Sequence, residues 1–343
     1  MSSTEVRKTI ETLEVRRSTD GDGNKCINQY VLIKSLGKGS YSKVKLCINT
    51  LDNELYAMKL CHKPTLQRKR RGSGTALDEV FKEVDILKKL RHPNIVTLFE
   101  VLDDPSCDTL FLVFEFLELG PAMTLSTSFA DQGLAPPAVE PLEEGVARSY
   151  FKDALNGLEY LHTTVGVVHG DIKPANLLVS AESILKIIDF GLAEYIDKEG
   201  CASEHKESIK EAKDGDEECN NSLTSSFSTP ATSTPAFTPP EAISWGLRRD
   251  RGTVATSPKP HRTPEGDIWA LGVTLYCFLV GRLPFETDNV LEMCCLIREQ
   301  EVNYPATISD EAKNLIQGML HKDPAQRYTI QRIKQHRWLV DPC

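Results

Sequence analysis

Two short stretches of the chain carry acidic, amide and amine side chains at spacings that suit the transfer of a phosphoryl group. In VVHGDIKPANLLV, residues 167–179, Asp171 stands two residues before Lys173 and five residues before Asn176. A second acid, Asp189, follows ten residues after this stretch and precedes Phe-Gly. Phosphoryl transfer needs a carboxylate to orient an attacking hydroxyl, oxygen ligands for magnesium and a cation near the transferring group. Asp171 fits the first role and Lys173 the third.

The spacing gains meaning from the residues around it. An Asp followed five residues later by Asn is common in surface turns and indicates little by itself. Here it coincides with flanking leucines and with IIDFG at residues 187–191. Together these motifs resemble the signature of the eukaryotic protein kinases, H-R-D-L-x-x-x-N followed by D-F-G. The resemblance makes Asn176 and Asp189 the magnesium ligands, and it covers most of the chain.

The resemblance implies an α+β, bilobal protein kinase fold that uses ATP and Mg²⁺. It predicts a protein kinase domain at residues 29–339, with a small β-rich lobe at 29–117 and a larger helical lobe at 118–339. Residues 1–28 are polar and lack sustained apolar periodicity. We therefore expect them to form a flexible tail, with at most a brief helix near residues 6–13.

A Gly-rich stretch near the N-terminus predicts a phosphate-binding turn. YVLIKSLGKGSYSKVKLCIN, residues 30–49, indicates two strands around a turn. Gly37 and Gly39 would let backbone amides approach phosphates closely, and Val44 would face the base. A plain hairpin turn is the alternative for a lone G-x-G, and the third Gly of the kinase loop is replaced by Ser42.

The next strand supplies a lysine for the phosphates. Alternation in ELYAMKLC places Ala57 and Lys59 on one face. The resemblance implies that Ala57 touches the adenine and that Lys59 reaches the α and β phosphates. Glu79 and Glu83 lie four residues apart on the following helix, and either could pair with Lys59. We choose Glu83 because its distance from HPNIV, residues 92–96, matches the corresponding kinase helix.

The resemblance also assigns the adenine end of the site. VTLFEVLDD and TLFLVFEFL predict two strands that lead to an interlobe hinge. Phe114 takes the gatekeeper position, and Glu115 and Leu117 would offer backbone groups to the adenine edge. Leu36 and Leu178 are further candidates for contact with the nucleotide.

Other segments narrow the resemblance to the calcium/calmodulin-dependent protein kinase kinases, which phosphorylate the activation loops of other kinases. These segments are residues 100–123, the basic insert KPTLQRKRRGSGT at 63–75, and TPAF before PPEAIS. Lys173 and Thr234 imply Ser/Thr specificity. We expect protein substrates, other kinases among them. The alternatives are a downstream calmodulin-type or checkpoint-type kinase and, from another class, a pseudokinase scaffold.

Two inserts differ in charge. The insert at 63–75 is basic and is a solvated loop, a chance match to a nuclear-import signal, or a docking patch for a protein substrate or regulator. From Glu194 to Cys219 the chain carries ten acidic and four basic side chains, followed by a Ser/Thr/Pro run. That composition is typical of disorder. We expect a long disordered insert in the activation segment at about residues 195–230.

Gly170 stands where the kinases usually have Arg. In kinases with that Arg, a phosphate on the activation loop neutralises its charge and orders the loop. Gly cannot supply the charge, so we expect activity without such a phosphate. The candidate acceptors are Thr229, Thr232 and Ser233.

Three charged residues in the second half predict bracing rather than chemistry. Glu241 in PPE is expected to pair with Arg327 in HKDPAQRYT. Asp267 would support the catalytic loop from below. The insert at residues 246–266 precedes DIWALGVTLYCFLVG, whose apolar residues predict a buried helix. A single last helix is expected in IQRIKQHRWLV.

The composition of the chain limits the classes of protein, partner and compartment that fit it. The chain of 343 residues is 40% hydrophobic and 26% charged, which is ordinary for a soluble globular protein. A net charge of −9 argues against nucleic-acid partners. No apolar run nears the roughly 20 residues that cross a bilayer, so no membrane association is expected.

Ten cysteines without a C-x-x-C pair fit the cytoplasm, with a nuclear share as an alternative. No basic amphipathic segment follows residue 340, so calmodulin control is not expected.

Overall fold

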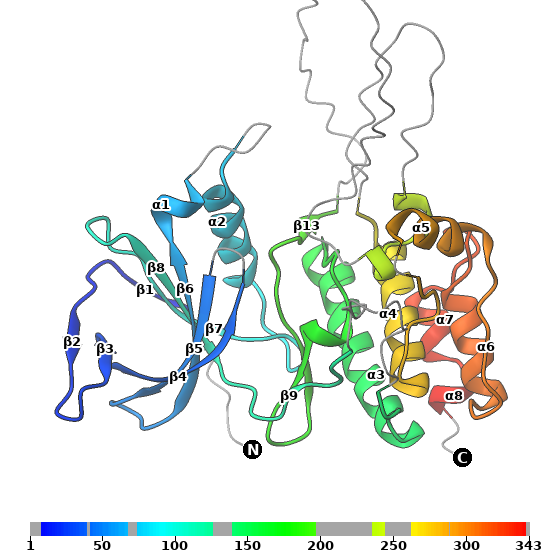
Figure 1. Cartoon of the computed structure of the whole chain (residues 1–343), viewed down its shortest axis with the longest axis horizontal. Coiled ribbons are helices and arrows are strands. Elements are labelled where there is room, and N and C mark those ends of the chain that lie inside the picture. The colour runs from blue at the N-terminus through cyan, green and yellow to red at the C-terminus, as the bar shows by residue number, and fades with distance from the viewer. Residues whose placement is uncertain are drawn as a thin grey trace, which may run out of the picture.

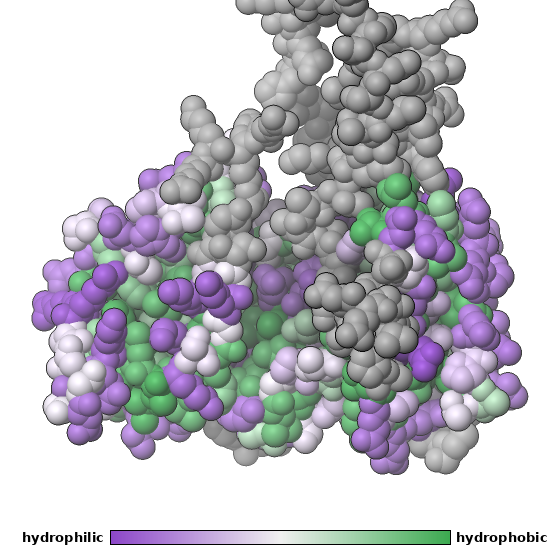
Figure 2. Space-filling model, in the orientation of Figure 1, coloured by the Kyte–Doolittle hydropathy of each residue, from purple (hydrophilic) through white to green (hydrophobic). Residues whose placement is uncertain are grey.

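The protein has two lobes, a β-rich small lobe and a helical large lobe (Figure 1). The computed structural model describes residues 8–39, 42–67, 74–125, 139–196, 235–243, 262–287 and 289–340. The expected α+β bilobal fold is confirmed. In Figure 2, hydrophilic residues line the outer rims of both lobes, and hydrophobic residues are visible on the face of the small lobe and between the lobes.

One eight-stranded sheet forms most of the small lobe, in the order β1-β7-β8-β6-β5-β4-β3-β2. Its strands are β1 (Ile10–Thr12), β2 (Arg17–Thr19), β3 (Lys25–Ile27), β4 (Tyr30–Lys38), β5 (Ser42–Asn49), β6 (Leu55–His62), β7 (Leu98–Leu102) and β8 (Thr109–Glu115). All neighbours are antiparallel except β1 and β7, which run parallel.

The expectation of a tail through residue 28 is wrong for residues 10–27, which contribute β1, β2 and β3. The brief helix expected near residues 6–13 is wrong as well, because Ile10–Thr12 is a strand paired with Glu100–Leu102. These strands have three residues each, and they are held by backbone hydrogen bonds at both edges of the sheet. Such pairing needs no apolar alternation, so the polar sequence does not reveal it.

The alternation expected in β6 is confirmed. Tyr56 and Met58 are buried in one cluster with residues of β8, while Ala57 and Lys59 alternate with them and face the other side. The small lobe also carries α1 (Lys63–Leu66) and α2 (Ala76–Leu87). α2 begins at a capping box, and its buried apolar residues are part of the hydrophobic core.

The large lobe is built around a helix buried on nearly all sides. The helices are α3 (Glu144–Glu159), α4 (Pro264–Val280), α5 (Val290–Glu299), α6 (Asp310–Met319), α7 (Ile330–Lys334) and α8 (Arg337–Val340). Every residue of α4 from Asp267 to Leu279 is buried. α4 begins three residues earlier than the sequence indicated, because Thr263 caps it by accepting from the Gly266 N–H. The expected last helix is two helices, α7 and α8.

The large lobe also contains two small sheets of short strands, of which β9 precedes α3 and the others follow it. β9 (Gly120–Pro121), β11 (Leu177–Val179) and β12 (Leu185–Ile187) form one sheet, and β10 (Val167–Val168) pairs with β13 (Glu194–Tyr195). Residue 195 therefore belongs to a strand and not to the expected insert. Residues 197–234, which hold the rest of that insert, lie outside the described residues. In the described ranges, no helix combines the length and apolar character needed to cross a membrane.

Candidate active site

A buried carboxylate fixes the loop that carries Asp171. Asp267 of α4 accepts the backbone N–H groups of His169 and Gly170, each at 2.8 Å, and its Oδ2 lies 2.8 Å from His162 Nε2. Burial alone would raise the pKa of Asp267, but the contacts with His162, His169 and Gly170 hold that pKa below its usual value. The expected bracing of the loop from below is confirmed.

Both side chains that the sequence placed beside Asp171 contact its carboxylate. Lys173 Nζ lies 3.0 and 2.8 Å from the two carboxylate oxygens of Asp171. Asn176 Nδ2 donates to the carboxylate and to the backbone oxygen of Asp171, each at 2.9 Å. The Asp171 side chain is only 9% exposed, so these donors hold it in one orientation.

Asp189 lies close to the same centre on a strained backbone. Its φ of 63° is in the left-handed region, which non-glycine residues rarely adopt. The following Phe190 is buried and stacks edge-on against His169, with ring centroids 5.0 Å apart. The N–H of Ile188, the residue before Asp189, donates to the Asn176 carbonyl at 2.9 Å. These contacts tie the second acid to the loop that holds the first.

The lysine and the glutamate chosen from the sequence form an ion pair across the small lobe. Lys59 Nζ lies 2.8 and 3.0 Å from the carboxylate oxygens of Glu83. The choice of Glu83 is therefore confirmed. Burial by itself would lower the pKa of Lys59, but the nearby carboxylates of Glu83 and Asp189 outweigh it and raise the pKa. Lys59 is thus a fixed cation that faces Asp189.

Residues 30–339 match the protein kinase domain. The chain belongs to the protein kinase family. Together with its curated relatives, this match makes the chain a serine/threonine protein kinase, which uses ATP and Mg²⁺ and acts on protein substrates.

Several curated kinases resemble this one over nearly its whole length. Serine/threonine-protein kinase GRIK2 of Arabidopsis thaliana is 36% identical over 331 residues, which are 96% of this chain and 70% of the relative. Serine/threonine-protein kinase ssp1 of Schizosaccharomyces pombe is 37% identical over 96% of this chain. The calcium/calmodulin-dependent protein kinase kinase of Caenorhabditis elegans is 35% identical over 92%. The kinase spans only 46% and 53% of the last two relatives.

The residues present suit a magnesium ion that is shared with nucleotide phosphates. Asn176 uses Nδ2 for both of its bonds to Asp171, so its amide oxygen points elsewhere. The Asp189 residue is exposed, and its carboxylate accepts only a long bond of 3.4 Å from the Gly191 N–H among the bonds to described residues. Within the described ranges no cluster of three or more His, Cys, Asp or Glu could hold a metal. Magnesium at kinase sites uses few protein oxygens together with phosphates, which fits this pair.

The candidate phosphate turn of the kinase lies beside Lys59. Gly37 of β4 pairs with Val44 of β5, and Val44 pairs in turn with Lys59 of β6. The Gly39 N–H donates to the Ser42 carbonyl at 2.9 Å and closes the turn. The sheet thus brings these sequence-predicted residues together, and their contact with a nucleotide stays a prediction.

At the adenine end, one predicted backbone group is already engaged. Ala57 pairs with Phe114 across β6 and β8, as the assignment of both to one pocket requires. The Glu115 N–H donates to the Thr97 carbonyl at 3.1 Å, and its carboxylate lies 2.7 Å from Lys186 Nζ. The N–H of Glu115 is therefore committed within the protein.

The remaining predicted residues differ in exposure. Leu117 is buried, and its carbonyl accepts from the Gly120 N–H at 3.2 Å. Leu36 is 40% exposed, and Leu178 is half-buried on β11. Thr234 lies outside the described residues.

Sequence reasoning found Asp267 but missed two other residues, His162 and Arg262, that hold the loop from a distance. His162 contacts Asp267 across 105 positions of sequence. Arg262 lies against Gly170 and pairs with Glu194 across 68 positions. In the sequence, His162 and Arg262 stand out only as polar residues near the predicted helices.

Proposed function

We propose that this kinase acts upstream of other protein kinases and phosphorylates their activation loops, with AMP-activated or calmodulin-dependent type kinases as the substrate class. The main support is the relative from Caenorhabditis elegans, whose name describes a kinase of kinases and which is 35% identical over 92% of this chain. The segment 100–123 supports the same group.

We assign the chemistry to the residues around Asp171. Asp171 orients the substrate hydroxyl and accepts its proton as the oxygen attacks the γ-phosphorus of ATP, whose bond to the bridging oxygen breaks to release ADP. Lys173, 2.8 Å from Asp171, places a positive charge beside that attack. Lys59 holds the α and β phosphates because Glu83 fixes its ammonium group. Asn176 and Asp189 would hold a magnesium ion, which would supply positive charge to the phosphates.

The paired geometry also bears on the pseudokinase alternative. A chain that had lost catalysis would have no need to keep Lys59 in an ion pair of 2.8 Å with Glu83. Such a chain would also have no need to keep the Asp171 side chain only 9% exposed, with Lys173 and Asn176 donating to its carboxylate. Both arrangements are preorganised for transfer, which supports the active enzyme.

The basic insert is a candidate docking patch for a folded kinase. Lys63 lies outside the patch, because its ammonium group pairs with Asp103 at 2.6 Å on the small lobe. The remaining cations, residues 68–71, lie outside the described residues. Neutralising all four should slow phosphorylation of a folded kinase far more than that of a short peptide. Equal losses on both substrates would count against docking.

The test of the proposal is transfer of labelled phosphate to a catalytically inactive AMP-activated-type kinase, compared with a generic Ser/Thr peptide. We expect kcat/KM for the folded kinase to exceed that for the peptide by more than about tenfold, or about 1.4 kcal/mol. The Asp171→Asn variant is the matched control for contaminating activity. Equal or faster transfer to the peptide would refute the upstream role while leaving Ser/Thr kinase activity intact. Repeating the assay with calcium and calmodulin tests whether calmodulin controls this chain.

A further inference from the structure

Gly170, beside the catalytic Asp171, leaves room for a distant arginine. Its φ is +75°, and a Cβ built there would lie 2.2 Å from Arg262 Cδ and 2.7 Å from Arg262 Nε. Any larger residue would collide with the Arg262 side chain and strain the backbone. The glycine therefore allows Arg262 to lie directly over the catalytic loop.

Arg262 continues from the catalytic loop to the activation segment. Its Nη1 lies 2.6 Å from Glu194 Oε1, and its side chain is only 23% exposed. Glu194 belongs to β13, where it pairs with Val168 of β10 just before the catalytic loop. Arg262 itself directly precedes the cap of α4, the helix whose Asp267 holds the N–H of Gly170. One guanidinium thus joins three segments that meet beside Asp171.

The next residue of β13 reaches the small lobe. Lys89 Nζ donates to the Tyr195 hydroxyl at 2.7 Å and lies 5.0 Å from the Tyr195 ring centroid. Lys89 follows the end of α2, the helix that carries Glu83. The two residues of β13 therefore bind opposite lobes, Glu194 through Arg262 and Tyr195 through Lys89.

We propose that Arg262 and Glu194 replace, in this kinase, the arginine before the catalytic Asp and the activation-loop phosphate that pairs with it. Arg262 brings to Gly170 the positive charge that the glycine lacks. Glu194 provides the negative charge that otherwise requires phosphorylation. β13 is thereby fixed against the catalytic loop by a permanent ion pair, and Arg262 acts as a positioning residue for Asp171.

An ordinary surface ion pair is the alternative, and such pairs contribute about 0–1 kcal/mol. Two observations argue against it. The Arg262 side chain is 23% exposed although that of Glu194 is 49% exposed, and the aliphatic stem of Arg262 occupies the space that a side chain at position 170 would fill. The pair also links segments 68 residues apart at the catalytic loop, whereas the exposed pair Arg16–Glu14 links residues only two positions apart.

The first arm of the test concerns phosphate. Wild-type enzyme treated with phosphatase, and a variant with Thr229, Thr232 and Ser233 all changed to Ala, should keep kcat within about threefold, or roughly 0.7 kcal/mol. Loss of most activity after phosphatase treatment, with recovery only on rephosphorylation of this segment, would overturn the proposal. Phosphopeptide mapping confirms that the treated enzyme carries no phosphate there.

The second arm removes the charges: Glu194→Gln keeps the size of the side chain, whereas Arg262→Gln also shortens it. Arg262→Gln and Glu194→Gln should each lower kcat by about tenfold or more, with little change in the KM for ATP. Combining them should cost little more than either alone, because both remove the same contact. Arg262→Lys should restore much of kcat, since it returns the charge. Arg16→Gln, in an exposed pair, is the control that should change nothing.

Thermal unfolding of each variant separates positioning from folding. We expect melting temperatures close to that of the wild type for Arg262→Gln, with the loss confined to kcat. Full kcat in both Gln variants would overturn the proposal. A fall in kcat only in step with the melting temperature, or no rescue by Arg262→Lys, would also overturn it, since either outcome describes a merely structural contact.

Discussion

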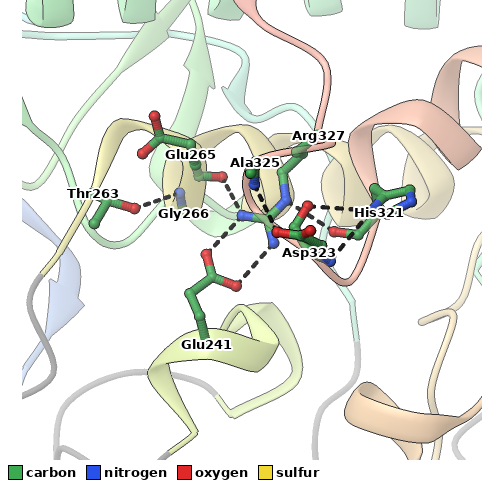
Figure 3. A network of polar contacts seen from close by, with 8 residues as sticks. All are labelled: Glu241, Thr263, Glu265, Gly266, His321, Asp323, Ala325 and Arg327. Atoms are coloured by element: carbon green, nitrogen blue, oxygen red, sulfur yellow. Dashed lines mark hydrogen bonds and ion pairs between the residues drawn. The ribbon is translucent and has the colours of Figure 1, made fainter.

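Arg327 carries a charge in the interior of the large lobe, and Glu241 is the carboxylate that compensates it (Figure 3). The guanidinium donates to both oxygens of Glu241, at 2.7 and 2.8 Å, and also to the backbone carbonyls of Glu265 and His321. Its side chain has no exposed surface, whereas that of Glu241 is 25% exposed. The pairing expected from the sequence is confirmed, and its burial allows the effect of breaking it to be estimated.

Glu241→Gln keeps the shape and one acceptor oxygen but removes the negative charge. Removing one partner of a buried pair costs about 3–5 kcal/mol, because the other charge stays buried without compensation. Arg327 would retain its two carbonyl acceptors and the face of Trp269, 5.3 Å away, and water can reach position 241. We therefore expect a loss near the lower bound, about 3 kcal/mol in the free energy of unfolding.

Urea unfolding followed by tryptophan fluorescence measures this loss. Trp269 and Trp338 are both buried in the large lobe, so they report the lobe that contains the pair. Glu14→Gln is the control, because the side chains of Glu14 and Arg16 are 78% and 85% exposed and the change should cost under about 0.5 kcal/mol. A similarly small cost for Glu241→Gln would refute the view that this pair holds the lobe together.

Three further predictions concern the catalytic loop and the thiols. Asp171→Asn should abolish transfer while leaving ATP affinity nearly unchanged, and Asp189→Asn should weaken magnesium-ATP binding as well; isothermal titration calorimetry and turnover measure the two effects. The carboxylate of Asp267 has a pKa held below its usual value, since its histidine and backbone contacts outweigh the opposing effect of burial. Its contribution to stability should therefore be complete above the unfolded pKa of about 3.9 and lost as the pH falls below it, so wild type and Asp267→Asn should converge in acid unfolding. Burial raises the pKa of the Cys61 thiol to about 11, so mass spectrometry after alkylation at pH 8 should find Cys61 unmodified while half-buried Cys107 reacts.

Local spacing brought three of the proposed chemical residues of this kinase together, and the neighbouring motifs with their resemblance to kinases indicated what they do. Asp171, Lys173 and Asn176 lie within six residues, so the turn of the chain itself brings them together, as their contacts of 2.8–3.0 Å confirm. The alternation of β6 likewise placed Lys59 on the face opposite Met58, because successive residues of a strand point to opposite sides. The pairing with Glu83, 24 residues away, came from the resemblance to kinases.

The three N-terminal strands show where sequence patterns fail. β1, β2 and β3 have three residues each, and most of their side chains are exposed. β1 and β2 exist because the edges of the sheet offer unpaired backbone groups, and among the three strands only β3 buries side chains, those of Cys26 and Ile27. The pattern that identifies a half-buried strand was therefore absent, and a polar tail was the natural prediction.

The sequence by itself determined which residues could transfer a phosphoryl group, and it showed that the position before Asp171 carries no charge. Only the tertiary structure decided that Arg262 lies against Gly170 and that Glu194 forms an ion pair with Arg262. No periodicity relates positions 170, 194 and 262, since their meeting depends on how α4 packs beneath the catalytic loop and on how β13 pairs with β10. A glycine leaves a space that the sequence can reveal, but the packing of the whole lobe selects the side chain that occupies it.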